Sequence, residues 1–120
     1  ARVRGGALMR LPQLTRRLVL EAPQRVPDGA GGFTQVWVAL GEHWAEVSAG
    51  TGREGAGEFL TLSAVPYRIV VRAAPVGADA RPRPEQRFRD GTRLFVINAV
   101  TEHDPRGHYL VCFAREEATA

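Results

Sequence analysis

The stretch from residue 87 to 113 constrains the fold of this chain most, because two turn signals divide it into three apolar segments. Asp90-Gly91 precedes the apolar segment 94–97, and such a pair favours a hairpin because glycine adopts positive φ without strain. Residues 104–107 have Asp, Pro and Gly at the positions that a β-turn prefers. The stretch therefore predicts three antiparallel strands. Apolar residues on both faces of the middle strand predict a central strand that is covered on both sides.

Earlier segments of the chain are rich in β-branched and aromatic residues and also predict strands. They lie at residues 15–22, 33–40, 44–47 and 66–73. The segment 44–47 is either a third strand or a continuation of 33–40 after a bulge. Residues 23–32 hold two prolines and three glycines and predict a long turn.

Two long loops complete the pattern, at residues 49–63 and 75–86. Glycines disfavour a helix at the start of the first loop, whereas residues 58–63 form either a short helix or a strand. A chain of 120 residues makes one domain. We predict an all-β fold, a small antiparallel β-barrel or sandwich of about six to seven strands with a long Gly-rich loop. Its parts are a flexible N-terminal arm (1–14), the domain itself (15–116) and a short tail (117–120).

Composition narrows the function only slightly. The net charge of +3 is modest, every basic residue other than histidine is arginine, and no segment is apolar enough to span a membrane. The single cysteine, Cys112, lies inside an apolar strand, which predicts a core residue rather than a disulfide or a nucleophile.

The motifs that suggest chemistry are weak. Residues 50–55 match G-x-G-x-x-G, but no helix of adequate length follows, and no acid lies about 20 residues later, as a dinucleotide site requires. His103 and His108 flank a turn that contains Asp104, yet no further ligand lies at a recognised spacing. We therefore predict no cofactor, no metal site and no enzymatic activity.

Arginines gather in two groups, and we predict subunit or partner contacts for them. A nucleic-acid surface is the alternative, but single-strand binders interleave such charges with exposed aromatic residues, and the aromatic residues here fall in the predicted strands. The residues concerned are Arg16, Arg17, Arg81, Arg83, Arg87 and Arg89.

Seven segments in this order resemble the phage head–tail joining family, also called head-closure or stopper proteins. They are RRLVLEAP (16–23), GGFTQVWV (31–38), WAEV (44–47), GRE (52–54), PYRIVVR (66–72), DGTRLFVINAV (90–100) and YLVCFARE (109–116). The resemblance covers most of residues 15–116. The loop 55–63 is richer in glycine, and the Pro-Arg loop at 75–86 is longer, than in the family pattern. The arginine-rich composition fits a prophage or a gene transfer agent of a GC-rich bacterium.

The resemblance implies a structural protein of the neck of a virion or phage-like particle, assembled in the bacterial cytoplasm. It would form a homo-oligomeric ring, expected to be sixfold, that closes the DNA channel after packaging and docks the tail. Its expected partners are an adaptor or portal-side neck protein, a tail terminator or other tail-side protein, and the packaged double-stranded DNA. A free-standing SH3-like or OB-like nucleic-acid-binding module is the alternative function.

A mobile loop would plug the channel in a protein of this kind. Residues 49–65 are the candidate, because glycine permits more than one backbone conformation. The residues singled out for this role are Gly50, Gly52, Arg53, Glu54, Gly55 and Gly57.

Overall fold

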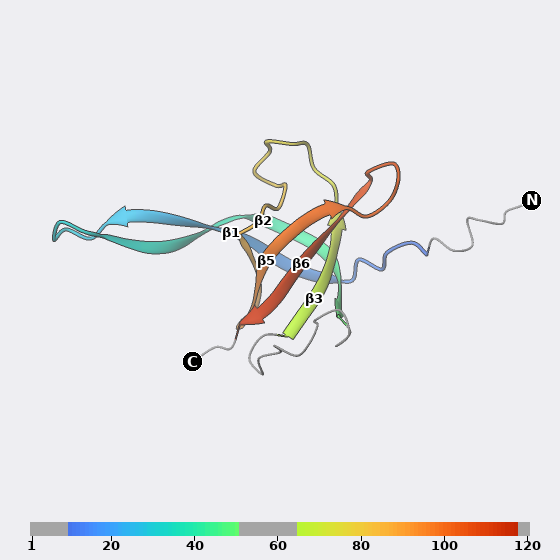
Figure 1. The fold of residues 1–120 in the computed structure, drawn as a ribbon, viewed down its shortest axis with the longest axis horizontal. Coiled ribbons are helices and arrows are strands. Elements are labelled where there is room, and N and C mark those ends of the chain that lie inside the picture. Colours follow the sequence, from blue (N-terminus) through green and yellow to red (C-terminus); the bar gives the residue numbers. More distant parts are fainter. Residues whose placement is uncertain (1–9, 51–64, 118–120) are drawn as a thin grey trace, which may run out of the picture.

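The structure, a computed structural model, describes residues 10–50 and 65–117. These residues form six antiparallel β-strands in one sheet that closes on itself as a barrel, in the order β1-β2-β3-β6-β5-β4 (Figure 1). The predicted all-β class is confirmed, and the short helix considered for 58–63 lies outside the described residues. The strands are β1 (Arg16–Pro27), β2 (Phe33–Ala49), β3 (Val65–Arg72), β4 (Arg87–Asp90), β5 (Arg93–Glu102) and β6 (Tyr109–Glu117).

The barrel interior is filled by side chains from all six strands. Phe88 on β4 and Phe95 on β5 are the largest fully buried side chains. Burial of one such side chain contributes roughly 1.5–3 kcal/mol to folding. Leu18 and Leu20, which lie on one face of β1 because side chains alternate along a strand, are also fully buried. The rest of the core comprises Ala45, Ile69, Val71, Ile97, Leu110, Cys112 and Ala114.

The meander predicted for residues 87–113 is present. Gly91 (φ 63°) and Gly107 (φ 70°) occupy the left-handed region in its two turns. The Asp104 carboxylate accepts hydrogen bonds from the backbone N–H groups of His108 (3.2 Å) and Tyr109 (2.9 Å). β5 is central, between β4 and β6. The expectation that both of its faces are covered was wrong: the inward face is buried, but the outward residues Leu94 and Val96 are only half-buried, because a barrel has one interior.

The prediction of a long turn at residues 23–32 was also wrong. β1 continues to Pro27, β2 begins at Phe33, and the turn between them is only residues 28–32. The two prolines are accommodated because this part of β1 is an edge strand, where a missing N–H donor costs no ladder bond. Beyond the barrel the paired strands project as a long two-stranded ribbon (Figure 1), here called the hairpin extension (residues 22–38).

β2 is one continuous strand, so the bulge alternative for 44–47 is confirmed. The register with β1 shifts between Leu20 and Glu21, where Gly41 (φ 142°) adopts a backbone conformation that other residues rarely reach. The bulge lies where the strands leave the barrel. It marks the base of the hairpin extension.

The parts of the chain outside the strands pack on the barrel. Arg10 forms an ion pair with Glu46 on β2, and Leu14 is half-buried, so the described part of the predicted N-terminal arm lies against the sheet. In the loop before β4, Pro82 is fully buried. β6 reaches Glu117, one residue beyond the predicted domain boundary. Among the described residues, no helix is long and apolar enough to cross a membrane.

Candidate interface: the hairpin extension and the barrel around it

A buried ion cluster holds the base of the hairpin extension. Glu21 on β1 is 5% exposed, and its two carboxylate oxygens accept hydrogen bonds of 2.7 Å from Arg87 and Arg89 on β4. Burial raises the pKa of the Glu21 carboxyl, but the hydrogen bonds from Arg89 and Arg87 outweigh it and leave the pKa below its ordinary value. Glu21 is therefore ionised at neutral pH and joins β1 to β4.

The same cluster reaches the extension through an aromatic ring. The Arg87 guanidinium lies 4.0 Å from the centre of the Trp37 ring, in a cation–π contact. Trp37 is opposite Pro23 in the ribbon, just beyond the bulge. The direction of the extension is thus set by Glu21, Arg87 and Trp37 together.

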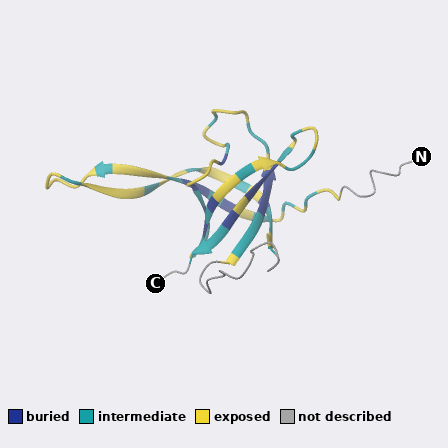
Figure 2. Ribbon diagram, in the orientation of Figure 1, coloured by how far each residue is buried: buried dark blue, intermediate teal, exposed yellow. Residues whose placement is uncertain are grey.

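The surface of the extension is apolar and nearly uncharged. Phe33 is 59% exposed, and Val36 and Val38 are also exposed. Only 2 of the 17 residues in 22–38 are charged, Arg25 and Asp28, against 24% of the whole chain. Figure 2 shows the extension mostly in the colour of exposed residues, while the barrel strands carry the buried positions. Depletion of charge with exposed aromatic and aliphatic side chains is typical of the centre of a protein–protein interface.

The tip of the extension is a turn closed by hydrogen bonds. The Asp28 carboxylate accepts hydrogen bonds from the backbone N–H groups of Ala30 (2.8 Å) and Gly32 (3.1 Å), which hold the turn and lower the pKa of Asp28. The Arg25 guanidinium lies 4.5 Å from the centre of the Phe33 ring. The tip therefore presents one aromatic ring flanked by a cation and an anion.

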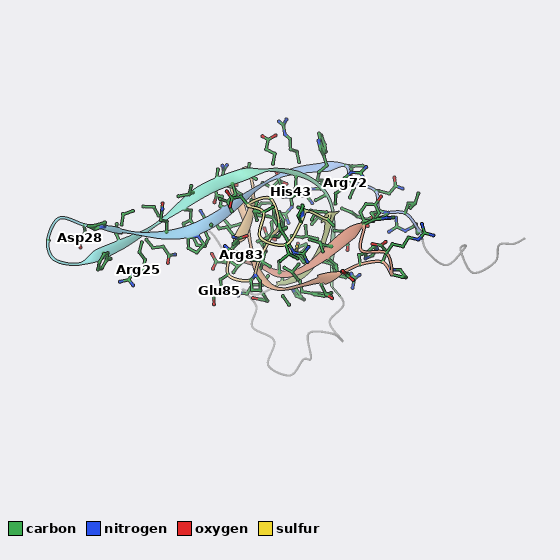
Figure 3. All side chains as sticks on the ribbon, turned by 90° about the horizontal axis from the view of Figure 1, so that it is seen from above. Arg25, Asp28, His43, Arg72, Arg83 and Glu85 are labelled. Carbon is green, nitrogen blue, oxygen red and sulfur yellow. The ribbon has the colours of Figure 1, made fainter. Side chains whose placement is uncertain are left out.

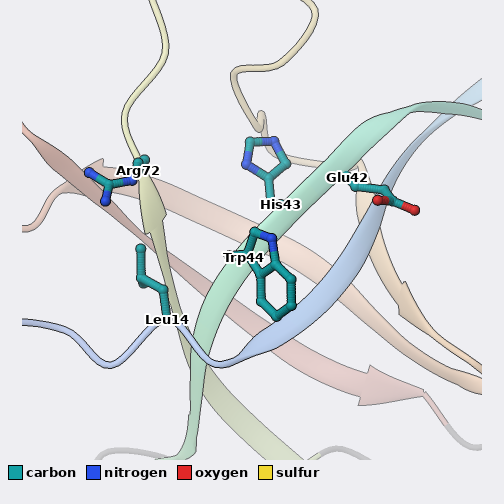
Figure 4. A pocket seen from close by; sticks show the side chains of 5 residues that line it. All are labelled: Leu14, Glu42, His43, Trp44 and Arg72. Atoms are coloured by element: carbon teal, nitrogen blue, oxygen red, sulfur yellow. The ribbon is translucent and has the colours of Figure 1, made fainter.

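A pocket of about 210 Å³ lies on the barrel near the N-terminal segment. Its lining is formed by Leu14, Glu42, His43, Trp44 and Arg72, which come from the chain before β1, from β2 and from the end of β3 (Figure 4). Trp44 is 55% exposed. His43 packs edge-on against Phe88, and burial lowers the pKa of the His43 imidazole, so this ring is neutral at pH 7.

The arginines predicted as partner contacts are largely used within the chain. Arg16 pairs with Asp90, Arg87 and Arg89 pair with Glu21, and Arg81 donates to the carbonyl oxygen of Ala74. Arg17 and Glu42 are both largely exposed, and the 3.9 Å between Arg17 Nε and Glu42 Oε1 makes a weak pair. Arg83 is exposed, and within the described residues it forms no ion pair. Contacts from these arginines to another subunit or protein stay a prediction.

Of the six residues predicted for a plug, only Gly50 lies within the described residues. Its backbone N–H donates a 2.8 Å hydrogen bond to the carbonyl oxygen of Pro66. This bond joins Gly50, which follows β2, to the start of the adjacent strand β3. Gly52, Arg53, Glu54, Gly55 and Gly57 lie outside the described residues.

A second ion pair strengthens this end of the barrel. The Glu116 carboxylate on β6 accepts two hydrogen bonds from Arg93 on β5, of 2.8 and 3.0 Å, and Arg93 also donates to the Tyr67 hydroxyl oxygen on β3 (3.2 Å). These bonds hold the pKa of Glu116 below its ordinary value and raise that of Arg93. Tyr67 pairs with Ala49 on β2, so the same network supports the strands that flank residues 51–64.

The groups considered for chemistry have structural positions. Cys112 is buried, as predicted, and burial raises the pKa of its thiol to about 12. Asp104 holds the turn between β5 and β6. Within residues 10–50 and 65–117, no group of three or more His, Cys, Asp or Glu side chains is arranged to hold a metal ion.

Comparison with known proteins decides the family. The model of the phage head completion protein family matches residues 9–117. This chain belongs to that family. The predicted resemblance is therefore confirmed, and a structural role in head completion follows from it. A structural role of this kind does not require an active site, and the lack of enzymatic activity stays a prediction.

Two solved structures resemble the head completion protein described here. A chain of the structure described as the virion of a native gene transfer agent particle is 65% identical, with a TM-score of 0.74, over 92% of this chain and 100% of that one. The solution structure of a Shigella flexneri 2a protein has a TM-score of 0.69 over 93% and 100% of the two chains, but at 20% identity it shows only the shared fold. No curated protein matches the chain. The predicted location in a virion or phage-like particle agrees with the family and with the first of these structures.

Sequence reasoning missed the hairpin extension and the Glu21 cluster. The strand at 33–40 was predicted, but Pro23 and Pro27 concealed the continuation of β1 that pairs with it. The pairing of Glu21 with two arginines 66 and 68 residues away had no local signal at all.

Proposed function

We propose that this protein forms a ring in the neck of a gene transfer agent or similar phage-like particle, where it closes the DNA channel after packaging and docks the tail. The ring is expected to be sixfold and to lie between an adaptor or portal-side protein and a tail-side protein. The observation that carries the proposal is the 65% identity, over nearly the whole chain, to a component of a gene transfer agent virion. A role of this kind needs subunit contacts rather than reactive groups.

The plug is assigned to the segment that begins at Gly50. The hydrogen bond between Gly50 and Pro66 holds the two ends of this segment side by side on β2 and β3. Glycine at positions 52, 55 and 57 removes side-chain restrictions on the backbone, and Arg53 and Glu54 supply charge. A segment anchored in this way suits a plug, because it can change conformation while the barrel keeps its place in the ring.

Deletion of residues 51–58 tests the plug. The deletion keeps Gly50 and its bond to Pro66, so the shortened chain should still be incorporated into particles. Nuclease-protected DNA per particle should fall strongly, because the channel stays open after packaging. A matched deletion of residues 76–78, in the loop before β4, should leave the DNA content unchanged. Normal DNA retention in the 51–58 deletion, with the protein present, would contradict the plug assignment.

The ring itself is tested by imaging the neck of purified particles. A closed ring of this chain between the head vertex and the tail is expected. Particles that lack this polypeptide at the neck would contradict the proposed function, whatever the behaviour of the plug deletion.

A further inference from the structure

We propose that the tip of the hairpin extension of one copy inserts Phe33 into the Trp44 pocket of the next copy, in a head-to-tail contact that repeats around the ring. The Trp44 pocket is the one lined by Leu14, Glu42, His43, Trp44 and Arg72. This inference rests on the proposed function, because it specifies how the copies in such a ring contact one another.

The extension lies outside the core of the barrel and leaves apolar side chains exposed. Two-stranded ribbons are marginally stable in water on their own. Among the described residues no third strand pairs with the ribbon along 22–27 or 33–38, and its apolar residues at these positions are half-buried or exposed. Only one cation, Arg25, lies in the extension, which disfavours DNA as the partner because DNA binding depends on several phosphate contacts. The apolar residues and low charge of the extension therefore suit a protein as the partner.

The Trp44 pocket has the size and character to receive an aromatic ring. The pocket opens to solvent, and its volume of about 210 Å³ leaves room for an aromatic ring, since a closed cavity of roughly 150 Å³ holds benzene. Trp44 is exposed beside it, and Leu14 adds aliphatic surface. An exposed tryptophan that receives an aromatic anchor is a common centre of binding energy in interfaces.

Charges at the two surfaces are complementary. The tip has Arg25 and Asp28 near Phe33, and the pocket has Glu42 and Arg72 near Trp44. Within the described residues, neither Arg25 nor Arg72 lies within 4.0 Å of a carboxylate oxygen, so both are available for pairing. One cation and one anion on each surface can pair across the contact without a net charge.

The placement of the two surfaces suits a ring. Seen from above, Asp28 marks one extreme of the molecule, whereas Arg72 lies on the part of the barrel farther from the extension (Figure 3). A projecting element on one side and its receptor on the other give a heterologous contact, the kind of contact that forms a ring when the rotation between neighbouring copies closes. The placement therefore favours a contact between two different surfaces of neighbouring copies over a contact between two identical surfaces.

Cross-linking in purified particles tests the proposal. The double variant Gln35→Cys/Gln13→Cys places one thiol on the face of the ribbon that carries Phe33 and one next to Leu14 in the chain. Both positions are exposed, while the native Cys112 is buried and protected from reagent. A short bis-maleimide should join the copies into a ladder of multiples of the 13.1 kDa chain. Each single variant should give no ladder, because the contact joins different surfaces.

Additional substitutions in the double variant identify the anchor. Phe33→Ala should reduce the ladder about tenfold, as expected when an interface loses about 1.4 kcal/mol. Val76→Ala is the control: Val76 is 85% exposed, lies outside both surfaces, and should leave the ladder unchanged.

Three outcomes would overturn the inference. One is a neck that contains the ring but yields no ladder, and in that case the proposed function survives. A second is cross-linking of Gln35→Cys to a different protein, which would make that protein the partner of the tip. The third is dimers from a single variant, which would show a symmetric contact. Absence of the chain from the neck would instead contradict the proposed function.

Discussion

The barrel and the hairpin extension use the same strands, β1 and β2, in opposite ways. In the barrel, Leu18 and Leu20 of β1 point into a core shared by all six strands. In the extension the ribbon has no core, and Phe33, Val36 and Val38 remain exposed. The change occurs at the bulge between Leu20 and Glu21.

This difference separates stability from recognition within one hairpin. The barrel part contributes apolar burial and holds the chain folded, whereas the extension contributes little burial and offers a surface. Glu21, Arg87 and Trp37 lie at the boundary and couple the two parts. Substitutions should therefore affect stability strongly on the barrel side of the bulge and weakly beyond it.

The largest effect is expected for Phe95→Ala in the barrel core. Phe95 is fully buried, so its loss should lower the free energy of unfolding by about 3–5 kcal/mol, measured by urea denaturation. If that variant does not fold, Ile97→Val should lower it by about 1 kcal/mol. A loss below about 0.5 kcal/mol for Phe95→Ala would show that the barrel core is not the source of stability.

Glu21→Gln at the boundary is expected to cost about 3 kcal/mol, because it leaves the nearly buried Arg87 without its carboxylate. The control, Glu42→Gln, removes an exposed carboxylate 3.9 Å from Arg17 and should change the free energy of unfolding by less than about 0.5 kcal/mol. Equal effects in the two variants would contradict the account of the base cluster.

The effect of Glu21→Gln should depend on pH. The pKa of Glu21 is lowered by folding, so its contribution is fully present above the unfolded pKa of about 4.3 and is lost as pH falls towards the folded value. Other carboxylates with lowered pKa, such as Glu116, titrate in both proteins and cancel in the difference. The difference in the free energy of unfolding between wild type and Glu21→Gln should therefore decrease below about pH 4. Urea titrations at several pH values measure it.

Asp28→Ala at the tip should have a smaller and more local effect. It removes two hydrogen bonds to backbone N–H groups, a loss of about 1 kcal/mol for the turn. Amide hydrogen exchange should accelerate in residues 22–38 and stay unchanged in the barrel strands. Faster exchange throughout the barrel would mean that the two parts unfold together.

The smallest effect on stability is expected for Phe33→Ala. Phe33 is exposed, so the free energy of unfolding should change by about 0.5 kcal/mol or less, although the cross-linked ladder should weaken. A loss of stability as large as that of Phe95→Ala would remove the distinction between the two regions.

Much of the barrel could be predicted from local sequence. The Asp90-Gly91 turn, the 104–107 turn and the alternation of Leu18 and Leu20 are short-range signals, and the structure confirms them. The extension was missed because proline suggests a turn unless the strand is known to lie at an edge, and that depends on the sheet as a whole.

The candidate site was less predictable. The arginines at positions 81, 83, 87 and 89 were recognised as a group. The pairing of Arg87 and Arg89 with Glu21 depends on closure of the barrel between β1 and β4, which no local pattern records. The Trp44 pocket likewise unites residues from three separate parts of the chain.

The central claim is that the barrel keeps the chain folded while the extension holds it in the ring. The direct test is the amount of chain retained in purified particles when residues 25–35 are replaced by Asn-Gly, which keeps the Gln24–Val36 pair in register. Far-UV circular dichroism checks the fold. The account predicts a folded β-protein that is largely absent from the particles. Retention equal to that of the full-length chain would contradict it.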